Sequence, residues 1–202
     1  MTKIVGITGG IGSGKTTFSN HLKKLGFLVN ESDAVVSEIY TKPKKEFLSF
    51  IKEKINKNKN ILILGFGGAS QAIYYGFFLK GYKNVSVFNR SKKAINISGT
   101  NNFTKDYSLI NPYLINSDLI INTTPINPLN KKQTNLIKKT TIISDIVYKP
   151  KETPFLKEFK LNKKIYGISM LVEQALPCFK QWFGFVPAVD ESLIKKIHKK
   201  IK

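Results

Sequence analysis

The sequence predicts an α/β protein in which helices flank a parallel sheet, and two observations carry this prediction. The order strand, glycine-rich turn, helix and strand occurs twice, once within residues 3–29 and once within residues 61–88. In addition, the run Ile61–Leu64 is apolar at four consecutive positions. A run of this kind is expected of a parallel strand that is buried on both faces. Apolar strands that alternate with helices are typical of α/β folds.

The first unit is expected to occupy residues 1–45. Gly26 ends its predicted helix, and the polar, proline-containing stretch Thr41–Lys45 interrupts the pattern, so we place a boundary there. The elements expected before this boundary are a strand at 3–8, a glycine loop at 9–14, a helix at 15–25, a strand at 27–29 and a short helix at 33–40. A fragment of about 40 residues is too small to bury a sheet by itself.

A larger domain is expected at residues 46–202. Apolar residues at helical spacing begin it, and a polar loop at 56–60 precedes the apolar run. Its further elements are expected to be strands at 85–88, 119–122 and 141–145, and helices that end near 79 and span 169–183 and 191–201.

Basic residues dominate the charge of the chain. Its 202 residues include 33 Lys and Arg against 13 acidic residues, a net charge of +20. Clustered cations would indicate nucleic-acid binding, but these are spread along the whole chain, so we favour a lysine-rich composition over a nucleic-acid partner. No apolar stretch approaches the ~20 residues of a membrane span. The lone Cys178 cannot form an internal disulfide, which favours a reducing cytoplasmic location.

The first glycine loop has the pattern G-x-x-x-x-G-K-[ST] between a predicted strand and a predicted helix, the context of a P-loop. Glycines let backbone N–H groups converge on phosphate oxygens. Lys15 is expected at the β and γ phosphates of ATP, and the Thr16 hydroxyl is expected to ligate Mg²⁺. The predicted phosphate-binding residues are Gly10, Gly12, Ser13, Gly14, Lys15, Thr16 and Thr17. We predict no other metal site.

This segment closely resembles the start of dephospho-CoA kinase. The residues that carry the resemblance are Val5–Thr17, Leu25-Gly26 and Glu31–Ala34. The resemblance implies that Asp33 is the carboxylate that acts at the acceptor hydroxyl, and Glu31 replaces the family's preceding acid. It ends near Tyr40, and the family's remaining core strands, CoA-binding helices and lid do not follow. A kinase-like phosphotransferase that binds ATP is therefore the alternative function.

The second glycine turn, Gly65–Ser70, also follows a strand and opens a helix, as dinucleotide-binding turns do. The end of the next strand, roughly 20 residues on, selects the cofactor, and an acid there would bind the ribose of NAD. Residues 89–93 contain no acid and place Arg90 and Ser91 at that position. A guanidinium fork and a hydroxyl suit a 2′-phosphate. The sequence therefore predicts a Rossmann-like domain that binds NADP through Gly65, Gly67, Gly68, Ala69, Asn89, Arg90 and Ser91.

Five motifs, in order, resemble the C-terminal half of shikimate dehydrogenase. They are Gly65–Ala72, Asn89–Ser91, Asn122–Pro125, Ser144–Leu156 and Gly167–Ala175. The resemblance implies an NADP-dependent oxidoreductase that interconverts shikimate and 3-dehydroshikimate in aromatic amino-acid biosynthesis. It implies that Asn122 and Thr123 lie along the cofactor near the nicotinamide ribose. The residues that it places at the nicotinamide and the substrate are Tyr148, Gly167, Met170 and Gln174, the last as a partner of a shikimate hydroxyl.

Two departures from this family bear on function. Asn127 stands where the family usually has glycine, and asparagine tolerates the positive φ that such a turn would need. Hydride transfer at an alcohol also needs a group that handles the hydroxyl proton. In the family a Lys and an Asp of the N-terminal substrate domain do this, and neither is present here.

We therefore expect a module that binds NADP but catalyses hydride transfer very slowly. Such a module would be completed by a partner chain or would be a non-catalytic remnant. A working enzyme that uses Lys15 or Asp33 for proton transfer is the alternative. Four apolar residues of the long C-terminal helix are expected to belong to the core: Met170, Leu171, Phe179 and Trp182.

Overall fold

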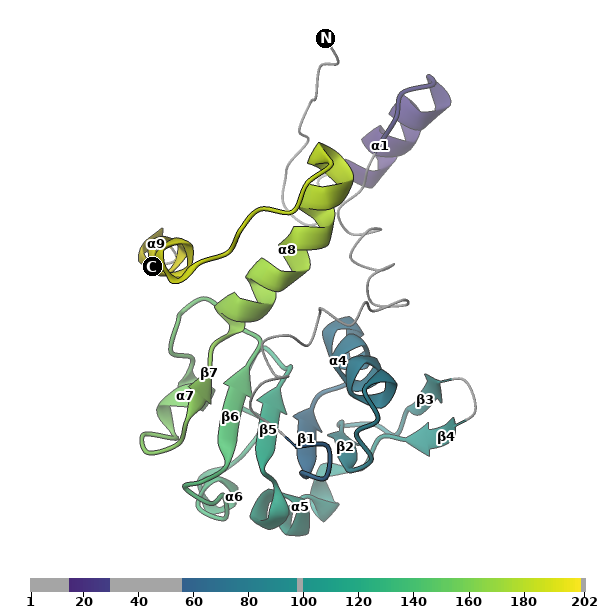
Figure 1. The fold of residues 1–202 in the computed structure, drawn as a ribbon. Coiled ribbons are helices and arrows are strands. Elements are labelled where there is room, and N and C mark those ends of the chain that lie inside the picture. The colour runs from purple at the N-terminus through teal and green to yellow at the C-terminus, as the bar shows by residue number, and fades with distance from the viewer. Residues whose placement is uncertain (1–14, 30–55, 98–99, 201–202) are drawn as a thin grey trace.

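The computed structural model of the protein describes residues 15–29, 56–97 and 100–200 (Figure 1). Four predicted features lie outside these residues: the strand at 3–8, the glycine loop at 9–14, the helix at 33–40 and the helical spacing that begins at 46. Among the described residues, no helix is both long and apolar enough to cross a membrane.

A five-stranded parallel sheet in the order β2-β1-β5-β6-β7 forms the centre of the structure (Figure 1). Its strands are β1 (Ile61–Leu64), β2 (Val85–Phe88), β5 (Leu119–Asn122), β6 (Ile142–Asp145) and β7 (Lys164–Ile165). The register pairs Leu64 with both Phe88 and Asn122, and Asn122 with Asp145. The carboxyl ends of the strands therefore lie along one edge of the sheet. The parallel α/β architecture predicted from the sequence is confirmed.

The sheet is apolar because helices cover both of its faces. On β1, Ile61 and Ile63 pack against α4 (Gly68–Leu79), whereas Leu62 and Leu64 pack against the opposite layer. All four side chains are at most 2% exposed. Burial of one such side chain stabilises a fold by about 1.5–3 kcal/mol, and the continuous apolar run of β1 follows from this two-sided burial.

Short helices form the layer opposite α4. They are η2 (Tyr107–Leu109), α5 (Asn111–Asn116), α6 (Lys131–Thr134) and α7 (Pro154–Lys157). Asn130 and Gln133 form a capping box at the start of α6, and the Thr153 side chain caps α7 ahead of a proline. Helices of one or two turns are too short for apolar periodicity to reveal, so no sequence pattern predicted them, although side-chain caps mark the starts of η2, α6 and α7.

A hairpin follows β2, where a doubly wound fold ordinarily places a helix. It consists of β3 (Ala94–Ile97) and β4 (Thr100–Phe103), which pair antiparallel. The hairpin brings the chain back beside the end of β2, where Phe88 and Lys105 form a parallel bridge. No sequence pattern predicted this element.

The C-terminal part of the described chain is helical, as predicted, and consists of α8 (Gly167–Phe183) and α9 (Glu191–Lys200). Gly184 ends α8 in the left-handed conformation, with φ of 78°. Met170 near the start of α8 is buried in the core beside β1. Phe179 and Trp182 near its end are 38% and 37% exposed. The expectation that they belong to the core is therefore wrong.

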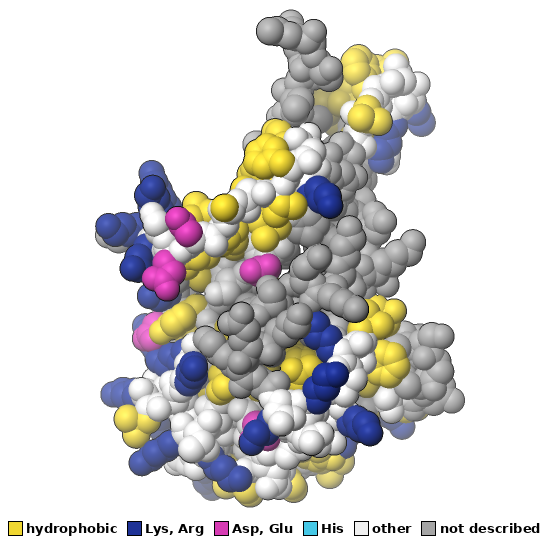
Figure 2. All heavy atoms as spheres, viewed as in Figure 1, with side chains coloured by type: hydrophobic (Ala, Val, Ile, Leu, Met, Phe, Trp, Pro, Cys, Tyr) yellow, Lys and Arg dark blue, Asp and Glu magenta, His cyan; other side chains and the backbone are white. Residues whose placement is uncertain are grey.

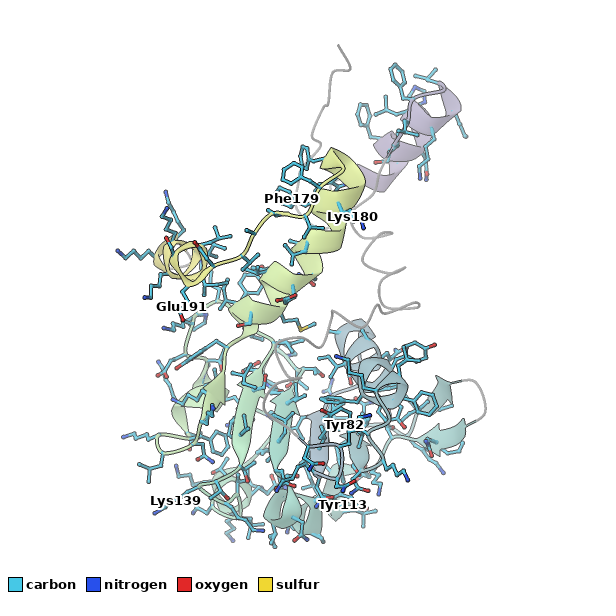
Figure 3. All side chains as sticks on the ribbon, viewed as in Figure 1. Tyr82, Tyr113, Lys139, Phe179, Lys180 and Glu191 are labelled. Carbon is cyan, nitrogen blue, oxygen red and sulfur yellow. The ribbon has the colours of Figure 1, made fainter. Side chains whose placement is uncertain are left out.

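The exposure of these aromatic residues follows from the direction of α8. The helix begins at the carboxyl edge of the sheet and runs away from it, and Phe179 and Lys180 lie at its far end (Figures 1 and 3). Apolar side chains are visible along much of its length on the surface (Figure 2). Only the first turns of α8 can therefore contribute to the core of the sheet domain.

Helix α1 (Lys15–Lys24) confirms the predicted helix of the N-terminal segment. Gly26 follows it with φ of 84°, in agreement with a glycine-terminated helix. The predicted strand at 27–29 is wrong, because these residues pair with no other strand of the described chain. Phe27 and Leu28 are 62% and 95% exposed.

Candidate functional site

The strand order creates a topological switch point at the carboxyl edge of the sheet. Strand β2 lies on one side of β1 and β5 lies on the other, so the connections that leave these strands diverge. Ligands of open α/β sheets bind at such a point. The turns that follow β1, β2, β5 and β6 all meet this edge, and they carry nearly all of the predicted cofactor residues.

Gly65 begins the turn after β1 and must be glycine for two reasons. Its φ is +97°, a conformation that side chains disfavour, and a Cβ atom there would lie 2.7 Å from Thr123 Oγ1 and 2.8 Å from Thr124 Cγ2. The Gly65 N–H donates to Phe88 O at 2.7 Å. Thr123 donates to Leu64 O from its backbone N–H and from Oγ1, at 2.9 and 2.7 Å. The turn thus ties β1 to the ends of both neighbouring strands.

Gly67 and Gly68 leave open space at the start of α4. A Cβ atom on either would meet nothing within 4 Å, and Gly67 is an N-cap without a side-chain hydrogen bond. The first N–H groups of α4 therefore face a space that an anion can approach. Ala69 packs on the core, and the buried Ser70 hydroxyl donates to Gly65 O at 2.8 Å. These contacts fit the residues to a pyrophosphate-binding turn.

The loop after β2 carries the predicted selectivity residues. Asn89 Nδ2 donates to Ser91 O at 3.0 Å, which closes the loop around Arg90. Arg90 is exposed, and no acidic residue of the described chain forms an ion pair with it. Lys92 Nζ lies 4.7 Å from the centroid of the Phe103 ring. The loop therefore presents, beside the glycine turn, a guanidinium that no described acidic residue neutralises.

Tyr107 was not among the predicted site residues, yet it lies between the two segments. Its ring packs edge-on against Phe88 at 6.2 Å between centroids. Its hydroxyl is buried and makes no hydrogen bond within the described residues. Burial raises the pKa of Tyr107 to about 12, although the Gly65 backbone and the Arg90 charge act to lower it. The hydroxyl therefore stays protonated and is available as a donor near the glycine turn.

Asn122 and Asp145 form a buried polar network at the ends of β5 and β6. Asn122 Nδ2 donates to Asp145 Oδ2 at 3.3 Å, and Asn122 Oδ1 accepts hydrogen bonds from Thr124. Asp145 also accepts from Thr153 Oγ1 at 2.6 Å and from Val147 N–H at 3.0 Å. The Asn122 side chain thus holds the neighbouring loops, and its expected contact with the nicotinamide ribose stays a prediction.

The turn that follows Thr124 does not need a positive φ. No described residue other than glycine has one, so Asn127 forms this turn without using the positive φ that asparagine tolerates. Asn127 Oδ1 instead accepts a hydrogen bond from Leu129 N–H at 3.0 Å. The Asn127 side chain thus closes the turn with its own hydrogen bond, which explains why the chain tolerates asparagine there.

The predicted nicotinamide and substrate residues lie on α8 and on the loop after β6. Gly167 is required, because a Cβ atom there would lie 2.3 Å from Ile146 O. This close approach fixes the start of α8 against the end of β6. Met170 is buried in the core, Gln174 is half-buried, and Tyr148 is 43% exposed. These residues share the carboxyl edge with the glycine turn, and Met170 is a packing residue.

Four of the seven predicted phosphate-binding residues, and Asp33, fall outside the described structure. Gly10, Gly12, Ser13, Gly14 and Asp33 lie outside the described residues. Lys15, Thr16 and Thr17 form the first turn of α1. In the part of the chain that the structure describes, no group of three His, Cys, Asp or Glu side chains is placed to hold a metal ion.

Three residues of this edge escaped the sequence analysis as site residues: Thr104, Tyr107 and Asp145. Asp145 ends an apolar strand, a position where a buried acid signals a polar network. Thr104 and Tyr107 carry no local pattern, and only the hairpin after β2 brings them to the site.

Comparison with known proteins finds similarity to different families in the two parts of the chain. The family model described as "Dephospho-CoA kinase" matches residues 3–63. The larger part is 36% identical over 151 residues to the shikimate dehydrogenase (NADP(+)) of Bartonella quintana, an alignment that covers 67% of this chain and 52% of the relative. The corresponding protein of Methanococcus maripaludis strain S2 is 38% identical over 158 residues, covering 69% and 56%.

A solved structure agrees with the similarity to shikimate dehydrogenases. The crystal structure of shikimate dehydrogenase from Aquifex aeolicus has a TM-score of 0.58 and 30% identity, and the match covers 75% of this chain and 59% of that one. About two thirds of the chain is thus homologous to shikimate dehydrogenases, and the kinase family model matches residues 3–63. The chain spans little more than half the length of the curated relatives it matches.

Asp145 should give the protein a distinctive pH dependence of stability. Burial raises its pKa in the folded protein above the usual 3.8, although hydrogen bonds from Thr153, Val147 and Asn122 oppose the shift. The folded protein then binds this proton more tightly than the unfolded chain does. Its stabilising contribution is therefore complete below pH ~4 and is lost as the pH rises through the raised pKa. Asp145→Asn should gain stability relative to wild type over that range, by up to about 1.4 kcal/mol per pH unit.

Urea unfolding at a series of pH values between about 3 and 7 measures this difference, and Asp118→Asn is the matched control. Burial acts to raise the pKa of Asp118, but hydrogen bonds from Asn60 and Lys59 and the Lys59 charge lower it. That control should lose stability relative to wild type as the pH rises, the opposite slope. A difference between wild type and Asp145→Asn that does not change with pH would contradict the prediction.

Proposed function

We propose, from the homology of two thirds of this chain with shikimate dehydrogenases, that residues 56–200 bind NADP(H) as the cofactor module of an oxidoreductase of that type. The observation that carries the proposal is the loop after β2, where Arg90 lies exposed and without an acidic partner among the described residues. The names of the matched relatives specify NADP(+). A cofactor with an extra phosphate is the ligand that such a loop suits.

The described residues fit a dinucleotide in their chemistry. The open space at Gly67 and Gly68 and the start of α4 suit the pyrophosphate. Arg90 and Ser91 would bind the 2′-phosphate, with Asn89 holding the loop. When bound, the cofactor supplies or accepts a hydride. The protein's part is to bind the cofactor, orient it and shield it from water.

The substrate side of the proposal rests on α8 and on the loop after β6. Tyr148 and Gln174 would contact shikimate or 3-dehydroshikimate at the nicotinamide end of the proposed cofactor site. The tight packing of Gly167 against Ile146 O supports this, because it fixes the helix that carries Gln174. The partners in this proposal are small molecules, and a second protein chain that completes the site is compatible with it.

We also propose that these 202 residues by themselves turn over slowly. The chain spans about half the length of its curated relatives, and the Lys–Asp pair that the resemblance implies for proton transfer has no counterpart in the sequence. Among the described residues, the buried acid at this edge is Asp145, which is already held by Thr153 and Val147. General acid–base catalysis contributes about 10²–10⁴-fold, so a deficit of that order is expected.

Binding of NADPH and NADH should differ in affinity. We expect NADPH to bind at least about tenfold more tightly, because Arg90 gains a charge-assisted interaction only with the 2′-phosphate. Arg90→Ala should weaken NADPH binding by about 1–3 kcal/mol, or roughly 5- to 150-fold, and leave NADH binding unchanged. Calorimetry or the fluorescence of the reduced cofactor measures both affinities.

Lys83→Ala is a suitable control for charge. Lys83 is also exposed and cationic, but it lies before β2, at the amino edge of the sheet. Its removal should change both affinities only slightly. Equal affinity of the wild-type protein for the two cofactors would refute the role of Arg90.

Turnover of shikimate should be detectable only at a low level. Purified protein with shikimate and NADP⁺ is expected to form NADPH about 10²–10⁴-fold more slowly than a full-length relative. Gln174→Ala should abolish that residual rate while NADPH binding persists. The absorbance of NADPH reports the rate, and a rate equal to that of the relative would show that the module is not impaired.

The kinase-like segment supports a second candidate function, binding of ATP. Its support is the match of residues 3–63 to the dephospho-CoA kinase family model. Lys15, Thr16 and the glycine loop would then hold ATP and Mg²⁺, with Asp33 at the acceptor hydroxyl. We regard this as the weaker candidate, because the family's lid and acceptor site do not follow in the sequence.

ATP binding is tested by the loss of a P-loop cation. Under this second function, the wild-type protein should bind ATP in the presence of Mg²⁺. Lys15→Ala should abolish this binding, because it removes the cation expected at the phosphates. Calorimetric titration with ATP provides the measurement, and Lys24→Ala at the other end of α1 is the control. Binding that survives Lys15→Ala would refute this second function.

A further inference from the structure

The loop that carries Arg90 is held by a residue from outside the dinucleotide motifs. After β2 the chain forms the β3–β4 hairpin and returns to the loop at Thr104, the residue that follows β4. Thr104 is 4% exposed although it lies beside an exposed loop. A buried hydroxyl in such a place is expected to make specific hydrogen bonds.

The Thr104 hydroxyl bonds the loop in both directions. Its Oγ1 accepts a hydrogen bond from Lys93 N–H at 2.8 Å and donates one to Ser91 O at 3.1 Å. The Thr104 N–H also donates to Lys93 O at 2.9 Å. One residue thus fixes the backbone on the C-terminal side of Arg90 through three hydrogen bonds.

The opposite side of the loop is fixed by the same returning segment. Asn89 N–H donates to Lys105 O at 3.0 Å, and Lys105 N–H donates to Val87 O at 2.8 Å. Ser91 O accepts from Asn89 Nδ2 as well as from Thr104 Oγ1. The backbone that flanks Arg90 is therefore held on both sides.

We infer that Thr104 is a positioning residue that sets the preference for a dinucleotide with a ribose 2′-phosphomonoester over one without it. The inference rests on the proposed NADP binding and extends it to a residue that contacts the loop rather than the cofactor. Preorganisation is the physical reason: a loop that is already ordered loses less conformational freedom when the phosphate binds. Binding of NADH does not use Arg90 or Ser91, so it gains little from that order.

Thr104→Val is the main test, because valine keeps the shape of the side chain and removes the hydroxyl. We expect NADPH affinity to fall roughly tenfold, which corresponds to the loss of about one net hydrogen bond. NADH affinity should change less than about twofold. Thr104→Ser keeps the hydroxyl and should restore the wild-type ratio of the two affinities, a rescue that a role in packing alone would not produce.

Thr141→Val is the matched control. Thr141 is 1% exposed, and its hydroxyl donates to Ser117 O at 2.8 Å at the amino edge of the sheet. The Thr141→Val variant loses a buried hydrogen bond of the same kind. It should therefore have a lower melting temperature but the wild-type ratio of NADPH and NADH affinities. A folded Thr104→Val protein that keeps the wild-type ratio would overturn the inference.

Hydrogen exchange of the wild-type protein provides a measurement that does not depend on a variant. The Lys93 amide should exchange at least about 100-fold more slowly than in an unstructured peptide, because it is bonded to Thr104. Exchange at the unstructured rate would overturn the inference even if Thr104→Val fails to fold. A wild-type protein without preference for NADPH would instead refute the proposed function, while protection of Lys93 would still report the hydrogen bond.

Discussion

The carboxyl edge of the sheet depends on the close contact between the Gly65 turn and the end of β5. Thr123 donates two hydrogen bonds to Leu64 O, and the space beside Gly65 is too small for a Cβ atom. This contact sets where α4 begins and therefore where its free N–H groups point. A larger residue at position 65 would separate β1 from β5 and displace the turn with its helix. The position of the proposed cofactor site is thus a consequence of strand packing.

A second constraint orders the other half of the same edge. Asp145 links Asn122 on β5 to Thr153 ahead of α7, and Gly167 brings the first turn of α8 against Ile146 O. The polar network is buried, so each of its members depends on the others for hydrogen bonds. The loops after β5 and β6 therefore behave as one unit. The residues expected at the nicotinamide end therefore lie beside Asn122 and Asp145, whose hydrogen bonds hold these loops in place.

The loop after β2 shows how a surface segment becomes ordered without being buried. Arg90 is exposed, but the backbone on either side of it is bonded to the segment that returns from the β3–β4 hairpin. Tyr107 follows on the same segment, and its buried hydroxyl lies close to both Arg90 and Gly65. A replacement of the usual helix by a hairpin therefore adds polar groups to the edge of the site.

The sequence by itself determined the parallel sheet, the glycine turn and the basic loop, because these depend on local patterns: a four-residue apolar run, glycines at fixed spacing, and the absence of an acid after β2. It also identified both family resemblances. Only the tertiary structure decided the roles of Thr104, Tyr107 and Asp145, the exposure of Phe179 and Trp182, and the failure of residues 27–29 to form a strand. Each of these depends on which distant segment lies alongside. Hydrogen bonds and burial between such segments leave no periodic signal in the chain.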